Sequence, residues 1–140
     1  GSHECIIAED LGIIPREVNE LRKRHKLKGM SVLQFAFDDD NKHNPHKPEN
    51  ITFDRVVYTG THDNNTSTGW WKEKQRKRLK PYIRDGETIC QTMIRLAKES
   101  PAGMAIIPLQ DILELGSEAR MNTPGVAFGN WKWKFRWDQL

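Results

Sequence analysis

Short apolar runs alternate with longer polar segments along this chain. The runs that we expect to form strands cover residues 5–8, 30–37, 56–59 and 105–109. The segments that we expect to form helices cover residues 15–26, 69–79 and 87–99. Because the strand candidates are nearly all apolar, both of their faces should be buried, as in a parallel sheet. The alternation of strand and helix therefore predicts an α/β fold.

Carboxylates stand at or just beyond the carboxyl ends of most of these strand candidates. In barrels and in open α/β sheets, this is the edge at which enzymes place their chemistry. About four βα units amount to half of an eightfold barrel, and half a barrel would leave the edges of parallel strands exposed. The pattern therefore already indicates an incomplete unit.

The composition is that of a globular domain with a core of its own. The chain has 140 residues, of which 36% are hydrophobic and 29% are charged, and its mean hydropathy is −0.74. No apolar run approaches the roughly 20 residues that cross a bilayer, so we expect no membrane partner. Residues 1–3 (Gly-Ser-His) have the form of an artificial scar, which leaves residues 4–140 as one domain. Cys5 and Cys90 are too few for a disulfide framework and indicate reduced thiols in an intracellular protein.

A basic run and an aromatic tail raise the question of nucleic-acid binding. The basic residues of the run are Lys72, Lys74, Arg76, Lys77, Arg78 and Lys80. Since the net charge is only +3, we interpret the run as a solvated helix face. Residues 131–137 alternate aromatic with basic side chains and could stack on bases. Strict alternation more simply predicts a strand with one apolar face, so we expect no nucleic-acid partner.

Glu9 and Asp10 form a carboxylate pair directly after the first strand candidate. A carboxyl group among low-dielectric strand ends has its neutral form favoured, which suits it to act as a general acid. The alternative is that one of the two simply caps the following helix. The spacing alone does not decide between these readings.

His62 and Asp63 follow the third strand candidate, after Gly60, which permits a tight backbone turn. Aspartate accepts two hydrogen bonds and histidine donates one, a combination that suits sugar hydroxyls. The alternative is a turn held by Asx-type hydrogen bonds. We expect no metal, because His43 and His46 lie in an irregular loop and no ligand stands at a useful spacing from His62.

Aromatic residues near the predicted strand ends could stack on sugar rings. They are Phe35, Phe37, Trp70, Trp71 and Trp131. Any one of these rings is more often a core residue than a binding platform. Trp70 and Trp71 are adjacent and should point in different directions, so at most one of them faces a ligand. We take Trp70 as the candidate.

Five segments stand in an order and at a spacing that is highly specific. They are residues 7–12 (IAEDLG), 29–37 (GMSVLQFAF), 57–64 (VYTGTHDN), 116–125 (GSEARMNTPG) and 129–131 (GNW). Together they resemble the amylomaltase, or disproportionating enzyme, family of 4-α-glucanotransferases. The resemblance covers nearly the whole chain after residue 3.

The resemblance implies that residues 4–140 are the C-terminal half of a (β/α)8 TIM barrel. It implies retaining transfer of α-1,4-glucan segments to glucose or to other glucans, with no metal or organic cofactor. It gives the general acid/base role to Glu9. Asp63 and His62 would hold the hydroxyls of the sugar at the scissile bond and favour its oxocarbenium-like form. Asp39 and Asn130 match further sugar contacts of the family.

One role stays unfilled in this resemblance. The family's nucleophilic aspartate lies on an earlier barrel strand in an Arg-x-Asp-His-like context, which neither residues 16–18 nor residues 54–56 match. Retaining transfer needs that carboxylate to form the covalent glycosyl-enzyme. We therefore expect the chain to be inactive alone. The alternative is a carbohydrate-binding or scaffold module without catalysis, against which the intact Glu9 argues.

Two expectations concern the surroundings of the protein. Half a barrel exposes apolar strand edges, so we expect self-association through them. The resemblance and the free cysteines place the protein in the cytoplasm of a bacterium or in a plastid.

Overall fold

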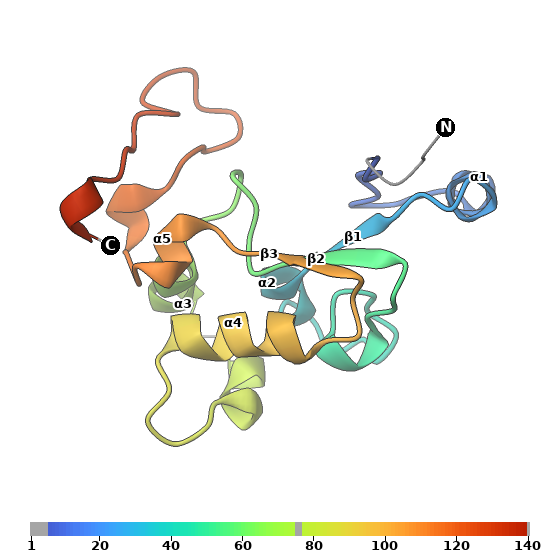
Figure 1. The fold of residues 1–140 in the computed structure, drawn as a ribbon, viewed down its shortest axis with the longest axis horizontal. Coiled ribbons are helices and arrows are strands. Elements are labelled where there is room, and N and C mark those ends of the chain that lie inside the picture. The colour runs from blue at the N-terminus through green and yellow to red at the C-terminus, as the bar shows by residue number, and fades with distance from the viewer. Residues whose placement is uncertain (1–5, 75–76, 140) are drawn as a thin grey trace.

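A parallel sheet of three strands forms the frame of the computed structural model, which describes residues 6–74 and 77–139 (Figure 1). The strands are β1 (Gly29–Val32), β2 (Arg55–Tyr58) and β3 (Met104–Ile106), in the order β1-β2-β3. Met30 pairs with Val56, and Val56 pairs with Met104. The expected α/β fold with a parallel sheet is confirmed. Residues 1–3, which the sequence analysis interprets as an artificial scar, lie outside the described residues, as do Cys5 and Arg76.

The first strand candidate is reduced to a single bridge. Ile7 pairs with Lys28 in parallel, and the N–H of Ala8 donates to the carbonyl of Lys28 at 2.8 Å. The segment that carries Glu9 therefore runs along the outer side of β1 as a fourth, minimal member of the sheet.

Helices follow each strand, and those after β1 and β2 lead to the next strand. The α-helices are α1 (Arg16–Arg24), α2 (Leu33–Ala36), α3 (Ser67–Lys74), α4 (Ile89–Glu99) and α5 (Leu109–Ile112). Short 3₁₀ helices cover Pro48–Asn50, Lys77–Tyr82, Ser117–Ala119 and Trp137–Gln139. The start of α4 is fixed by a capping box, in which Thr88 and Gln91 each bond the other's backbone N–H. None of the helices in the described part of the chain is long and apolar enough to cross a membrane.

The hydrophobic core lies between one face of the sheet and helices α2, α3 and α4 (Figure 1). Its buried members are Leu33, Ala36, Phe37, Ile51, Val57, Trp70, Leu79, Met93, Leu96 and Ala97. The opposite face of the sheet is less covered, since Met104 is 49% and Ile106 is 38% exposed. The sheet is therefore packed on one face and partly open on the other.

The predicted strand 30–37 was too long. The chain leaves the strand after Val32 and forms α2, so that Leu33, Ala36 and Phe37 face one core. These positions follow the i, i+3, i+4 spacing of a helix, a signal that the continuous apolar run concealed.

The predicted strand 131–137 is wrong. These residues form no strand in the structure, and only Trp137 enters a 3₁₀ helix. Trp131 has a left-handed φ of 60°, and its N–H donates to the carbonyl of Met121 at 2.7 Å. Alternation makes a strand only where a neighbouring strand edge is available for pairing, and this tail pairs with none in the described chain.

Helix α1 forms where the sequence predicts it, but its apolar stripe does not pack against the core. Val18 is 49% and Leu21 is 53% exposed. The helix projects from one end of the molecule, apart from α3 and α4 (Figure 1). Its buried residue is Arg22, at 5% exposure.

The described residues of the basic run form a solvated face. Arg78 forms a bidentate ion pair with Asp40, with both nitrogen–oxygen distances at 2.5 Å. The hydrogen bond from Arg78 lowers the pKa of the Asp40 carboxyl. Lys77 and Lys80 are exposed.

Candidate active site at the sheet edge

The loop of residues 60–66 leads from β2 to α3 and carries His62 and Asp63 at the carboxyl edge of the sheet. Within the loop, Asn64 Oδ1 accepts hydrogen bonds from the N–H and the hydroxyl of Thr61, both at 2.8 Å. Side-chain hydrogen bonds thus hold this turn, but Asn64 bonds back to Thr61 and not to the backbone two residues on as in an Asx turn. His62 and Asp63 lie between the two bonded residues.

Gly60 is needed for a different reason from the tight turn that the sequence indicated. Its φ is not in the left-handed region. A Cβ at this position would lie 2.7 Å from Nε2 of Gln34. That nitrogen donates to the carbonyl of Asn65 at 2.8 Å. Gly60 therefore allows a buried side chain from α2 to support the far end of the loop.

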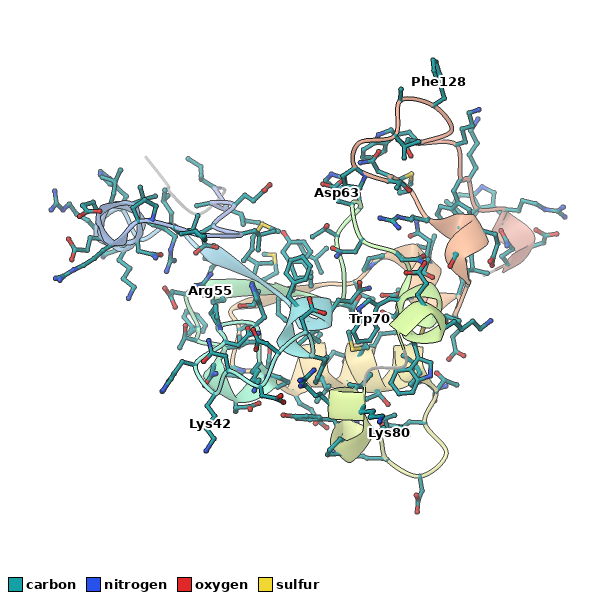
Figure 2. All side chains as sticks on the ribbon, turned by 180° about the vertical axis from the view of Figure 1, so that it is seen from behind. Lys42, Arg55, Asp63, Trp70, Lys80 and Phe128 are labelled. Atoms are coloured by element: carbon teal, nitrogen blue, oxygen red, sulfur yellow. The ribbon has the colours of Figure 1, made fainter. Side chains whose placement is uncertain are left out.

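Asp63 is half-exposed and is held from a second segment of the chain. Its Oδ1 accepts a hydrogen bond from Nδ2 of Asn122 at 2.6 Å and lies 3.3 Å from Nε2 of His62. Arg120 donates to the backbone carbonyl of Asp63 at 2.8 Å. Figure 2 shows Asp63 on the loop that stands out from the body of the protein. These contacts fix the carboxylate and leave its remaining surface to a ligand.

An aromatic ring stands beside His62. The ring centroids of His62 and Trp131 are 5.1 Å apart with an interplanar angle of 36°. Trp131 is 60% exposed, and a flat exposed ring next to polar groups is suited to a sugar face. The sequence placed Trp131 among the candidate rings, but the structure brings it to the site through the backbone bond to Met121.

Glu9 faces the same hollow as His62 and Asp63. The hollow has a volume of about 340 Å³, and its lining residues include Glu9, Tyr58, His62, Asp63 and Ile106. Glu9 is exposed. Burial raises the pKa of the Tyr58 hydroxyl, which keeps it protonated and able to donate. Two carboxyl groups, an imidazole and a phenol thus surround one open space.

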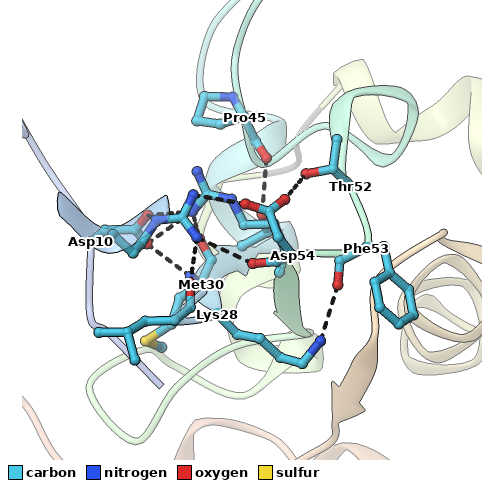
Figure 3. Close-up of polar contacts among 11 residues, drawn as sticks. Asp10, Lys28, Met30, Pro45, Thr52, Phe53 and Asp54 are labelled. Carbon is cyan, nitrogen blue, oxygen red and sulfur yellow. Dashed lines mark hydrogen bonds and ion pairs between the residues drawn. The ribbon is translucent and has the colours of Figure 1, made fainter. Parts of the chain in front are cut away.

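Asp10 points away from that space into a buried ion-pair cluster (Figure 3). Its Oδ2 lies 2.7 Å from Nη1 of Arg55 and 3.4 Å from Nε of Arg22. Its Oδ1 accepts the N–H of Met30 at 2.8 Å. The side chain of Asp10 is only 6% exposed. Asp10 therefore anchors the segment to β1 and β2 and does not cap α1, which begins after Pro15 without a side-chain cap.

Asp39 lies on the other side of Asp63. Both line a wider hollow of about 700 Å³, together with Phe35 and Pro124. Asp39 Oδ1 accepts the N–H of Asn41 at 3.0 Å. This hollow shares Leu11, Thr61 and Asp63 with the one at Glu9, so Asp63 stands where the two meet.

Two candidate residues are placed differently. Trp70 is 6% exposed and belongs to the core, where its ring centroid lies 6.2 Å from that of Phe37 (Figure 2). That burial leaves little ring face for stacking on a sugar. Asn130 uses its amide within its own loop, accepting the N–H of Thr123 at 3.0 Å and donating to Val126 at 2.8 Å. These contacts count against direct sugar contact by either residue.

The sequence reasoning missed Arg120 and Asn122, which hold Asp63, and Arg55, which holds Asp10. The first two lie inside the segment 116–125 that carried the resemblance, but nothing in that segment alone shows which side chain it meets. Their pairing spans 57 and 59 residues of chain, so only the fold brings them together.

Metal-binding groups do not gather at the site. Among the described residues no group of three His, Cys, Asp or Glu side chains could hold a metal ion. His46 uses Nδ1 to accept the N–H of Val32 at 3.1 Å. Burial lowers its pKa, and the nearby Arg55 charge acts in the same direction.

Known proteins are similar in sequence to this chain over nearly its whole length. The profile of a family described as 4-alpha-glucanotransferase matches residues 2–139. The 4-alpha-glucanotransferase of Synechocystis is 48% identical over 146 residues, which cover 100% of this chain and 29% of that protein. The chloroplastic/amyloplastic 4-alpha-glucanotransferase of Arabidopsis thaliana is 52% identical over 134 residues, which cover 92% of this chain and 23% of that protein. The chain thus spans about a quarter of the length of these relatives.

Solved structures agree with the sequence match. An amylomaltase from Streptococcus agalactiae in complex with acarbose superimposes with a TM-score of 0.90 at 31% identity, covering 96% of this chain and 28% of that one. An amylomaltase from Corynebacterium glutamicum has a TM-score of 0.63 at 16% identity, which supports the fold alone. With a family profile matched across residues 2–139 and relatives near 50% identity, this chain belongs to the 4-alpha-glucanotransferase family.

Proposed function

We propose that this chain is the C-terminal part of a retaining 4-α-glucanotransferase barrel and supplies its general acid/base. The observation that carries the proposal is that Glu9, His62 and Asp63 line one open hollow at the carboxyl edge of a parallel sheet. This is the edge at which barrel enzymes bind their substrates. Residues 4–140 would form about four βα units of the barrel.

Each residue at the hollow has a role in this proposal. Glu9 is exposed and lies outside the ion-pair cluster of Asp10. It protonates the leaving glycosidic oxygen and then activates the incoming sugar hydroxyl. Asp63 and His62 hold the hydroxyls of the sugar at the scissile bond. Trp131 offers its exposed ring as the adjoining wall.

The nucleophile has no assigned residue in this chain. Asp63 is held by Asn122 and lies beside His62, which suits binding and charge stabilisation. We therefore propose that the 140-residue chain binds α-1,4-glucans without transferring them. Acarbose is the appropriate probe, since an amylomaltase of similar fold has been solved in complex with it.

Calorimetric titration of the chain with acarbose tests the binding half of the proposal. We expect measurable affinity that falls at least about tenfold in Asp63→Asn, which loses charge-assisted hydrogen bonds to the ligand. Asp138→Asn, on the exposed 3₁₀ helix at Trp137–Gln139, is the matched control and should bind as the parent does. Equal affinities in both variants would refute the assignment of Asp63.

Glucose release from maltotriose tests the catalytic half. A chain without its nucleophile should lose several powers of ten in rate. Release of glucose at the rate of a full-length family member would show that a carboxylate of this chain serves as nucleophile.

The open sheet edges lead to a further part of the proposal, which is pairing with a second copy of the chain. Ile7, Met104 and Ile106 are 38%, 49% and 38% exposed on the uncovered side of the sheet, where strand edges recruit partners. Sedimentation velocity should show concentration-dependent dimers, whereas a monomer at all concentrations would contradict this.

For location, we propose a bacterial cytoplasm or a plastid, the latter because plant relatives bear the description chloroplastic/amyloplastic.

A further inference from the structure

Among the described residues, Asp111 is the most deeply buried carboxylate that the proposed chemistry does not use. It lies in α5, directly after β3, and is 1% exposed. It lines neither the hollow at Glu9 nor the wider one at Asp39, but it borders a third hollow of about 170 Å³ beside His62 and Trp131. A buried charge of this kind is costly unless several donors satisfy it, so its partners show what it is for.

Three hydrogen bonds converge on this carboxylate from both ends of the loop 60–66. At the start of the loop, the hydroxyl of Thr59 donates to Oδ2 at 2.5 Å. At the end of the loop, the N–H of Ser67 donates to Oδ1 at 2.7 Å and the Ser67 hydroxyl donates to Oδ2 at 2.8 Å. Thr59 and Ser67 are both 0% exposed.

The bond to Ser67 has an electrostatic component as well. Ser67 is the first residue of α3, and the first turn of a helix carries unpaired N–H groups and a partial positive charge. A carboxylate placed there is stabilised by both. Asp111 thus links the two ends of the loop, because it bonds Thr59 just after β2 and Ser67 at the start of α3.

The neighbouring residue of α5 extends the same support. Gln110 Nε2 donates to the carbonyl of Ala119 at 3.3 Å, just before Arg120 and Asn122, which hold Asp63. One short helix therefore supports both the loop that bears Asp63 and the segment that restrains it.

We propose that Asp111 is a positioning residue that sets the geometry of His62 and Asp63 by tying both ends of their loop. For a ligand in the hollow of Glu9, which Asp111 does not line, it acts through that loop. The inference deepens the proposed function and rests on it for the ligand, but its effect on the loop is measurable without any sugar.

The sugar-free arm of the test uses amide hydrogen exchange in the 140-residue chain. In Asp111→Asn we expect exchange at Ser67 and at residues 61–64 to speed up by about tenfold, as a charged hydrogen bond is lost. The amide of Thr92, bonded to Thr88 in α4 at 2.9 Å, should be unaffected. The control is Leu96→Ala, a core variant in α4 at a site that is 6% exposed, which lowers stability without touching the loop.

The sugar-binding arm compares acarbose affinities well below the unfolding transition of each variant. Asp111→Asn should bind about tenfold more weakly, and Leu96→Ala should bind as the parent does. If the two variants are equally destabilised and bind equally, Asp111 is merely structural and the proposal fails. If the parent itself binds no acarbose, the proposed function fails while the exchange arm still decides the role of Asp111.

A second pair of variants keeps the test open if Asp111→Asn does not fold. Thr59→Val has the same shape but lacks the hydroxyl donor, whereas Thr59→Ser keeps it and loses only a methyl group. Loop protection and acarbose affinity should fall in Thr59→Val and be restored in Thr59→Ser, even though serine leaves a small cavity. Identical behaviour of the two would overturn the proposal.

Discussion

The two carboxylates that meet at the hollow are held in opposite ways. Asp63 lies on a loop that is tied by α2, by α5 and by the segment around Arg120, all within the packed half of the molecule. Glu9 lies on a segment with one strand bridge and one buried ion-pair cluster, next to a helix whose apolar stripe faces solvent. The Asp63 side is thus held by several segments of this chain, whereas the Glu9 side depends on few contacts.

The largest effect is expected from a variant that removes Asp10, the anchor of the Glu9 segment. Asp10→Asn leaves the partly buried guanidinium of Arg55 without its carboxylate and the buried one of Arg22 with Asp54 alone, which should lower the free energy of unfolding by about 3 kcal/mol. Urea denaturation measures it. Arg16→Ala, which breaks the exposed Arg16–Glu20 pair of α1, is the control and should cost under about 0.5 kcal/mol. Similar costs for both would mean that the cluster does not anchor the segment.

A smaller loss of stability is expected on the Asp63 side, because several hydrogen bonds hold that loop. Asn122→Ala removes the 2.6 Å hydrogen bond to Asp63 and should cost about 1 kcal/mol of stability. Acarbose affinity should fall several-fold. The matched change Asn19→Ala in α1 should leave affinity as it is. A cost above that of Asp10→Asn would reverse the comparison.

The pH dependence of the free energy of unfolding should reflect the burial of His46 beside β1. His46 has a folded pKa below its ordinary 6.5, first because of burial and then because of Arg55. Its neutral form is therefore favoured in the folded state, and the stability it contributes is present above pH 6.5 and is lost as the pH falls through that value toward the folded pKa. In His46→Gln, which does not titrate, stability should fall less between pH 7 and pH 5. Parallel curves for the two proteins would argue against this role.

The smallest effect on stability is expected at the open stripe of α1. Leu21→Lys replaces a side chain that is 53% exposed and should change the free energy of unfolding by under about 0.5 kcal/mol. Self-association, measured by sedimentation, should decrease if this stripe contributes to the contact between copies. A large loss of stability would show that α1 packs more tightly in solution.

The sequence predicted the parts of the site that depend on local order along the chain. β2 runs into His62 and Asp63 as the pattern indicated, because a short apolar strand followed by polar turn residues has few other outcomes. The roles of Glu9 and Asp63 came from the resemblance, and the structure brings both residues to one hollow.

What the sequence could not supply were the pairings between distant segments. Spacing alone did not show whether Glu9 or Asp10 caps the following helix, and Asp10 is bound to Arg55 instead. The supporting residues Asn122 and Asp111 likewise meet the loop only through the fold. The tail 131–137 failed for the same reason, since its alternation was real but no strand edge was available to pair with it.

The cluster around Asp10 also bears on the order in which the site assembles. Asp10 and Arg55 are separated by 45 residues of chain, and the entropy lost on closing a loop rises with its length. The pairing also requires β1 and β2 to be already aligned, because Arg55 donates to the carbonyl of Met30 as well. The segment that bears Glu9 should therefore dock only after β1 and β2 have paired, so that a chain stalled before that step would lack its proposed acid/base in place.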